Sequence, residues 1–373
     1  MLKKISVSNF KGFKDEFVFD LGETNGYSFN QEAVINGIVN NAIVYGANGV
    51  GKSNLGLAIF DLISHLTDLE GGNTQYVNYK NAYDVNGLVS FKFEYDFDGQ
   101  IVLYNYSKRS REEIVKEEFF ISDKRVAYLE KTTEKTLVEI DLKGTETLNK
   151  DLSNNNISLL KYIKNNAILI DDFEKEVFYR FFNFIEGMLY YRSTLNDNYL
   201  GLVSGNISLD DDIIENGYLK DFEVFLNKVG IECKLDTVTV AGKKEIVMNF
   251  EHKQVRFFNI ASSGTIALTL FYFWYHRIKN SDKVKFIFID EFDAFYHQKL
   301  AKLIVEILKK TGVQFVLTTH NTSIMTNDLL RPDCYFIMDN KQIKSLANLT
   351  NKELREAHNI EKMYKANSFN INV

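Results

Sequence analysis

One stretch decides the expected fold of this chain: Ile43-Val44-Tyr45-Gly46-Ala47-Asn48-Gly49-Val50-Gly51-Lys52-Ser53. Its second part matches the pattern G-x-x-x-x-G-K-[ST]. An apolar run leads into the glycines, and an amphipathic run from Leu55 to Leu66 follows them. A strand, a glycine-rich loop and a helix are the context that a phosphate-binding P-loop requires, although a glycine-rich turn ahead of an ordinary helix is the alternative.

The residue types in this loop suit phosphate binding. Gly46, Gly49 and Gly51 let the backbone curl and turn several N–H groups inward. The helix that follows points its positive end at the same place. Lys52 is expected to reach the β- and γ-phosphates, and the Ser53 hydroxyl is expected to ligate Mg²⁺. The sequence therefore predicts that ATP and Mg²⁺ bind here.

Composition places the chain among ordinary globular proteins. The 373 residues are 45% hydrophobic and 25% charged, with a net charge of −6, which gives no strong global attraction to nucleic acid. Cys233 and Cys334 lie far apart and fit a reducing compartment. The N-terminus lacks a signal-peptide core, and the most apolar window, Ile266 to Tyr275, is too short to span a bilayer. We expect a soluble, cytoplasmic protein without a membrane partner.

Hydrophobic periodicity divides the chain into parts with different expected structures. Alternation with period two in residues 88–143 predicts an antiparallel β subdomain, which we expect to span residues 71–143. Residues 144–250 are expected to form a helical and mixed insertion: residues 145–230 change to three-to-four spacing, with one apolar face from Phe173 to Leu189, and residues 233–250 predict a hairpin. Residues 251–373 alternate between helix and strand patterns and, with the P-loop half in residues 1–70, predict one mostly parallel sheet. The expected fold class is therefore α/β, with one P-loop nucleotide-binding core split by the insertion.

An acidic pair follows an apolar strand in the last part, Phe286-Ile287-Phe288-Ile289-Asp290-Glu291. At the carboxyl end of a parallel strand, such a pair faces the ligand crevice. Asp290 is expected to hold Mg²⁺, directly or through water, and Glu291 to activate the attacking water as a general base. Alone, this pattern also fits a surface turn, but the P-loop upstream favours the catalytic interpretation.

Two more segments fit the same crevice. The apolar run from Phe315 ends at His320, one helix after the acidic pair, which favours a switch histidine that senses the γ-phosphate; a structural histidine is the alternative. Ser262-Ser263-Gly264-Thr265 precedes an apolar helix. This segment fits a helix N-cap and also an anion site, whose phosphate could belong to a second protomer.

The order of these elements resembles the ABC-type ATPases of the RecF, SMC and OLD (overcoming-lysogenization-defect) group. That order is P-loop, Ser-Ser-Gly-Thr, acidic-pair strand and histidine strand. The segment Ile5–Phe13 is similar to the opening strand of that group. The run Asp290–His297 and the tail Asn359–Tyr364 resemble the small OLD-like bacterial ATPases that carry the AAA name.

The resemblance implies a role for each matching residue. Residues 48–53, beginning with Asn48, would wrap the phosphates. Ser263 and Gly264 would form a signature segment that reaches the partner's γ-phosphate across a head-to-tail dimer. Asp293 would belong to a D-loop at that interface, and His320 would be the switch residue. Lys52, Glu291 and His320 would thus be the catalytic set.

This chain also departs from the family pattern. Gln75 is only a candidate for the Q-loop glutamine, and no heptad pattern predicts a long coiled coil. Few residues follow His320, so we expect the TOPRIM nuclease domain of full-length OLD proteins to be absent. A cutting or killing group would then come from a separate protein.

The expected function is Mg-ATP hydrolysis at a composite site of a homodimer or a higher homo-oligomer. The resemblance implies a sensor or regulator in bacterial anti-phage defence (abortive infection), acting with a separate nuclease or toxin as effector. One alternative is a RecF-like ATPase of DNA repair or recombination. Another is an ATP-dependent scaffold with little turnover. Charge does not indicate nucleic-acid binding, although a local basic patch stays open.

Overall fold

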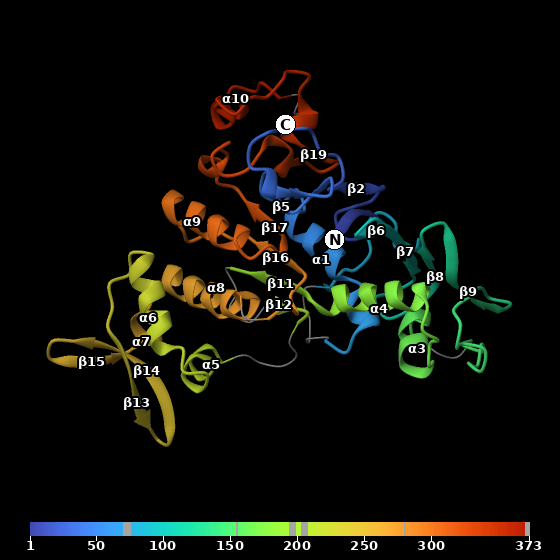
Figure 1. Ribbon diagram of the computed structural model, residues 1–373, viewed down its shortest axis with the longest axis horizontal. Helices are drawn as coiled ribbons and strands as arrows, with labels where there is room; N and C mark the ends of the chain where they lie inside the picture. Colours follow the sequence, from blue (N-terminus) through green and yellow to red (C-terminus); the bar gives the residue numbers. More distant parts are fainter. Residues whose placement is uncertain (70–75, 154–155, 194–198, 203–207, 280, 370–373) are drawn as a thin grey trace.

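Two seven-stranded sheets organise the chain (Figure 1). The computed structural model describes residues 1–69, 76–153, 156–193, 199–202, 208–279 and 281–369. In the central sheet the inner strands run parallel, and an antiparallel strand closes each edge. From edge to edge its strands are β12 (Tyr199–Leu200), β11 (Met188–Arg192), β16 (Phe286–Asp290), β17 (Gln314–Thr319), β5 (Asn41–Tyr45), β18 (Tyr335–Met338) and β19 (Ile343–Ser345).

The central sheet is buried because its strands are almost continuously apolar, as expected for parallel strands covered on both faces. Figure 1 shows α8 (Ser263–Lys279) and α9 (Gln298–Lys309) on one side of it and α1 (Lys52–Phe60) on the other. Gly56 lets α1 approach closely, since a Cβ atom there would lie 2.7 Å from the Phe288 ring. The predicted α/β fold class is confirmed.

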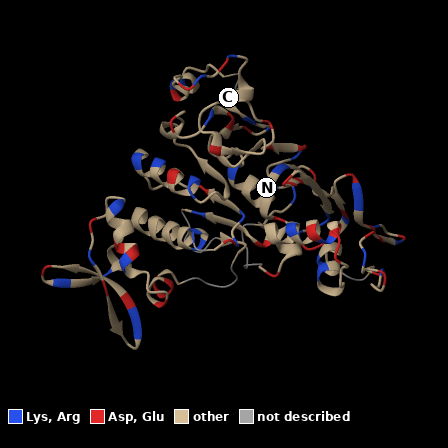
Figure 2. Cartoon of the chain, viewed as in Figure 1, with Lys and Arg blue, Asp and Glu red and all other residues tan. Residues whose placement is uncertain are grey.

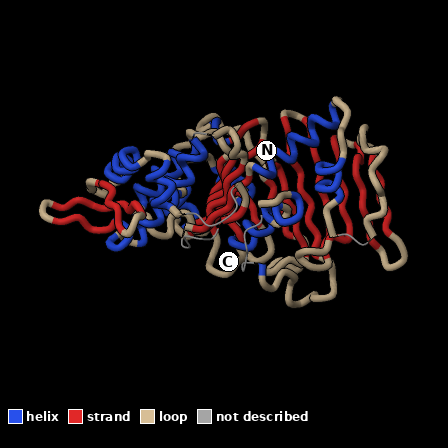
Figure 3. Tube along the Cα trace, turned by 90° about the horizontal axis from the view of Figure 1, so that it is seen from below, coloured by secondary structure: helices blue, strands red, loops and turns tan. Residues whose placement is uncertain are grey.

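The second sheet is antiparallel throughout and lies beside the first (Figure 3). The antiparallel structure predicted from the alternation is present, but two N-terminal strands also join it, so the sheet crosses the boundary predicted at residue 70. The four-part division of the chain stays a prediction. The strands are β10 (Thr136–Ile140), β9 (Lys124–Lys131), β8 (Ile114–Ile121), β7 (Gln100–Lys108), β6 (Val89–Phe97), β1 (Leu2–Ser8) and β2 (Phe17–Asp20).

An aromatic core joins this sheet to α4 (Phe173–Glu186), where Phe181 packs against Tyr104 and Phe119. The predicted helix through Leu189 is wrong at its end. The chain turns at Gly187, where a Cβ atom would lie 2.2 Å from the Lys283 carbonyl oxygen. The residues that follow enter the central sheet as β11, parallel to β16. The middle of the chain therefore supplies a strand to the central sheet.

A smaller lobe projects from the N-terminal end of α8, at the left of Figures 1 and 3. The predicted hairpin at residues 233–250 is confirmed, and a third strand extends it. The lobe consists of α5 (Leu209–Glu215), α6 (Leu219–Lys228), β13 (Leu235–Val240), β14 (Lys243–Phe250), β15 (Lys253–Arg256) and α7 (Phe257–Ile260). The remaining elements include β3 (Val34–Ile35), β4 (Ile38–Val39), α2 (Ile63–Leu66), α3 (Leu159–Asn166) and α10 (Ile360–Lys365).

Charges of both signs are interspersed over the molecule (Figure 2). Several ion pairs lie on the antiparallel sheet, so positive charge there is locally balanced. Within the described ranges, helices of the length and apolarity needed to cross a membrane do not occur. The sheet pairs include Lys3 with Glu94, Lys92 with Glu16, and Arg125 with Glu139.

Candidate nucleotide-binding and active site

The P-loop connects the end of β5 to the start of α1, as the sequence predicts. Gly49 and Gly51 have φ angles of 81° and 105°, which favour glycine. At Gly46 a Cβ atom would lie 2.6 Å from the Met338 carbonyl oxygen. The backbone geometry therefore favours glycine at each of these positions, and together the glycines form the tight turn that a phosphate cradle requires.

Lys52 is buried and folds back over its own loop. Its Nζ donates hydrogen bonds to the carbonyl oxygens of Gly46, at 2.8 Å, and Ala47, at 3.0 Å. Burial lowers the pKa of Lys52, while Asp290 and Glu291 act in the opposite direction. Phosphate oxygens could take over the hydrogen bonds that the ammonium now gives to the loop.

Ser53 and Asp290 meet at the start of α1. The Ser53 hydroxyl donates a hydrogen bond of 2.7 Å to Asp290 Oδ2, and the Thr318 hydroxyl donates one of 2.7 Å to Asp290 Oδ1. Hydroxyl and carboxylate oxygens are the donors that Mg²⁺ prefers, so this pair fits the predicted ion. The part of the chain that the structure describes holds no cluster of three or more metal-binding side chains. Mg²⁺ would therefore be held together with phosphates and water, as is usual for this ion.

Glu291 follows Asp290 on a strained backbone, with φ at 51°. Its N–H donates a hydrogen bond of 2.8 Å to the Thr318 hydroxyl. Its carboxylate forms an ion pair with Arg192, with 2.9 Å between Oε1 and Nη2. The two acidic residues thus lie where the sequence placed them, at the carboxyl end of a parallel strand.

Arg192 and Thr318 are site residues that sequence reasoning missed. Arg192 is the last residue of β11 and lies in register with Asp290 on β16. The run Met188–Arg192 is a short apolar segment that ends in a charge. The sequence prediction assigned its first two residues to the preceding helix, so the strand was not recognised. Thr318 was visible only as part of the strand that leads to His320.

His320 comes directly after β17, and its Nδ1 lies 3.4 Å from Lys52 Nζ. Burial and the Lys52 ammonium lower the pKa of His320, and Glu291 partly opposes them. Both effects favour the neutral imidazole, which can donate one hydrogen bond and accept another. The structure brings His320 to the P-loop, while its role as a switch stays a prediction.

The predicted signature residues do not join this crevice within one protomer. Ser263 and Gly264 begin α8 beside α7, away from α1 (Figure 1). The N-cap interpretation is supported, because the Thr265 N–H donates a hydrogen bond of 3.2 Å to the Ser262 hydroxyl. Ser263 is exposed, so a second protomer could reach it.

Asp293 is buried within one protomer, and its place at a dimer interface stays a prediction. It is only 7% exposed, and its Oδ1 accepts a hydrogen bond of 2.6 Å from the Thr319 hydroxyl. Burial raises the pKa of Asp293, and the Thr319 hydrogen bond partly opposes this. In this conformation Asp293 ties the loop after the acidic pair to the histidine strand. The Q-loop candidate, Gln75, lies outside the described residues.

The N-terminal loop at residues 9–14 also borders the P-loop. A Cβ atom at Gly12 would lie 3.1 Å from Asn54 Nδ2, and one at Gly51 would lie 3.4 Å from the Phe13 ring. The opening segment of the chain is therefore part of the wall of the crevice, which its sequence alone did not reveal.

Comparisons with known proteins give a family match and several solved structures of low identity. Residues 42–326 match a family described as "AAA domain, putative AbiEii toxin, Type IV TA system". An SMC head domain from Thermotoga maritima is 14% identical, with 95% of this chain and 99% of that chain covered and a TM-score of 0.42. A Pyrococcus furiosus Smc head domain with an extended coiled coil is 13% identical, with 98% of each chain covered and a TM-score of 0.44. Because these identities and TM-scores are low, our assignment of the fold rests on the strand order and pairing described above.

A search of curated proteins finds no match. The family match is therefore the comparison that classifies the chain. Because the matched residues make up more than half of it, the protein belongs to this family of AAA domains.

Proposed function

We propose that the protein binds Mg-ATP and hydrolyses it in the crevice between the P-loop and the acidic pair. The observation that carries this proposal is the 2.7 Å hydrogen bond from Ser53 Oγ to Asp290 Oδ2. It joins the two residue types that hold Mg²⁺ in P-loop enzymes, from segments far apart in the sequence. Lys52, Glu291 and His320 surround the same point.

Each side chain has a task that suits its position. Lys52 would bind the β- and γ-phosphates, and Ser53 and Asp290 would hold the magnesium ion, which neutralises phosphate charge. Glu291 would orient the attacking water and accept its proton. His320, neutral and next to Lys52, would hydrogen-bond to the γ-phosphate side of the nucleotide.

The catalytic unit that we propose is a head-to-tail homodimer. The signature residues Ser263 and Gly264 lie at the exposed N-terminus of a long helix, away from the P-loop of their own protomer. Two exposed apolar side chains lie close by. Ile260 precedes the signature residues by three positions, and the Phe295 carbonyl oxygen lies close to Gly264. A second copy that covered this surface would receive the helix N-terminus at its γ-phosphate.

Mixing two inactive variants tests this composite site. Lys52→Ala disables the P-loop, and Ser263→Arg blocks the signature segment, so each variant alone should lack turnover. In a mixed dimer, the P-loop of the Ser263→Arg protomer meets the signature of the Lys52→Ala protomer. Turnover should therefore return on mixing. A mixture as inactive as its parts, with both variants folded and able to dimerise, would contradict the composite site.

The biological role that we propose is a sensor or regulator in anti-phage defence, with a separate toxin or nuclease as effector. The family description, which names a putative AbiEii toxin of a type IV toxin–antitoxin system, supports a place in such a system, and the separate effector rests on the resemblance stated from the sequence. The balanced charges on the antiparallel sheet do not favour a RecF-like DNA-repair role. Phage plating on cells that carry the gene with its native neighbours should show protection that Glu291→Gln alters. Equal plating with and without the gene would count against the role.

A further inference from the structure

Arg192 contacts both acidic residues of the site from a strand that belongs to the middle of the chain. Its Nη2 lies 2.9 Å from Glu291 Oε1, and its Nε lies 3.4 Å from Asp290 Oδ2. Parallel pairing of β11 with β16 places Arg192 directly beside Asp290. The contact is therefore fixed by the sheet register rather than by a loop.

The backbone next to Arg192 is also tied to the acidic pair. The Ser193 N–H donates a hydrogen bond of 3.1 Å to the Asp290 carbonyl oxygen. The Ser193 hydroxyl donates one of 3.3 Å to the Phe292 carbonyl oxygen. These bonds hold the chain on both sides of Glu291, so the guanidinium starts from an anchored position.

The ion pair between Arg192 and Glu291 is partly shielded from water, which favours a fixed orientation of the two side chains. The side chains of Arg192 and Glu291 are 30% and 27% exposed, and that of Asp290 is fully buried. A guanidinium presents a planar fork of donors, which orients a carboxylate better than the point charge of a lysine can. One guanidinium thus lies against both carboxylates, with its Nη2 close to Glu291 and its Nε facing Asp290 without a hydrogen bond.

We propose that Arg192 is a positioning residue for Glu291, which speeds ATP hydrolysis by holding that carboxylate in place and does not itself bind ATP. This inference rests on the hydrolysis proposed above. Catalytic geometry is sensitive, since a misplacement of about 1 Å can lower a rate roughly 100-fold. A residue that acts only through Glu291 should change turnover and leave substrate binding nearly as it was.

The test compares steady-state ATP hydrolysis of the wild type and Arg192→Gln. We expect kcat to fall about 10- to 100-fold while the KM for ATP changes by less than about threefold. Arg192→Lys keeps a positive charge but loses the fork, so its kcat should lie between those of the wild type and Arg192→Gln.

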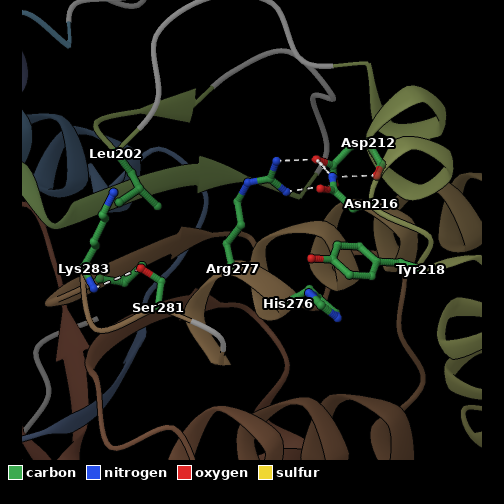
Figure 4. A pocket seen from close by; sticks show the side chains of 9 residues that line it. Leu202, Asp212, Asn216, Tyr218, His276, Arg277, Ser281 and Lys283 are labelled. Carbon is green, nitrogen blue, oxygen red and sulfur yellow. Dashed lines mark hydrogen bonds and ion pairs between the residues drawn. The ribbon is translucent and has the colours of Figure 1, made fainter.

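Arg277→Gln is the matched control. The Arg277 side chain is 31% exposed and pairs with Asp212 beside a separate cavity of about 350 Å³ (Figure 4). Removing it deletes a similarly shielded ion pair that does not touch the acidic pair of the crevice. Thermal unfolding should show a comparable loss of stability in Arg192→Gln and Arg277→Gln, but Arg277→Gln should keep the wild-type kcat.

The outcomes separate this inference from the function on which it rests. If purified wild-type protein does not hydrolyse ATP, the proposed function fails. If the wild type hydrolyses ATP and Glu291→Gln does not, but Arg192→Gln matches the wild type, only the inference is overturned. A higher KM with an unchanged kcat would also overturn it. Should Arg192→Gln fail to fold, Arg192→Lys decides, because full turnover of that variant would contradict a need for the fork.

Discussion

Carboxylates lie at both ends of α1, in contrasting surroundings. At its C-terminal end, Asp61 is fully buried and accepts hydrogen bonds from Lys108, at 2.7 Å, and from the hydroxyls of Tyr79 and Tyr106. At its N-terminal end, Ser53 bonds to Asp290, beside the strained and partly exposed Glu291. The satisfied cluster anchors the helix to the antiparallel sheet. In the strained cluster Asp290 is buried but Glu291 stays partly exposed, which is what a reacting carboxylate requires.

The largest effect on stability is expected at the anchored end. Lys108→Met removes one partner of a fully buried ion pair and leaves the Asp61 charge uncompensated, which should cost about 3–5 kcal/mol of unfolding free energy. ATP turnover of the folded protein should persist. Urea unfolding and an ATPase assay of the same sample measure both. A Lys108→Met protein as stable as the wild type would show that this cluster is not an anchor.

The reverse pattern is expected at the reactive end. Asp290→Asn keeps the side-chain shape but removes the charge that would hold Mg²⁺, so turnover should fall about 100- to 1000-fold. Stability should change far less than in Lys108→Met, because the substituted amide can still bond to Ser53 or Thr318. Turnover near the wild-type rate would show that Asp290 does not hold the ion.

A smaller effect concerns the loop before α1. Gly51→Ala places a side chain at a φ of 105°, which should cost about 1–2 kcal/mol of stability and raise the KM for ATP. Gly242→Ala is its control, since it imposes similar strain at a φ of 83° on a hairpin tip in the projecting lobe. Similar unfolding midpoints with a raised KM only in Gly51→Ala would support the phosphate cradle, whereas equal KM values would contradict it.

The smallest expected effect is on how stability depends on pH. His65, at the anchored end, should contribute more to this dependence than His320, at the reactive end. Burial and then Lys108 lower the pKa of His65 well below its usual range. The unfolded chain therefore binds a proton that the native state refuses, and stability should fall as pH drops below about 6.5. His65→Gln should flatten this fall in urea unfolding between pH 7 and pH 5. His320→Gln should flatten it less, because His320 is less buried than His65, and an equal effect of both would contradict this ranking.

Local patterns predicted most of the reactive end. The P-loop, the acidic pair and the strand to His320 each depend on a few consecutive residues whose spacing requires one geometry. The apolar strands of the central sheet could also be predicted locally, because continuous hydrophobic runs indicate strands that are buried on both faces.

Contacts between distant segments could not be predicted in this way. Arg192 reaches Glu291 only because Gly187 ends a helix and β11 pairs with β16. The joining of β1 and β2 to the antiparallel sheet and the burial of Asp293 likewise depend on partners far away in the sequence. Periodicity describes one element at a time, so it does not show which elements become neighbours.

The most direct measurement is ATP turnover of the wild type and of Glu291→Gln, combined with light scattering with and without Mg-ATP. We predict that the wild type hydrolyses ATP, and that Glu291→Gln loses turnover yet holds Mg-ATP in a larger assembly than the nucleotide-free protein. Unchanged turnover and unchanged assembly in Glu291→Gln would contradict both the catalytic role of the acidic pair and the shared site.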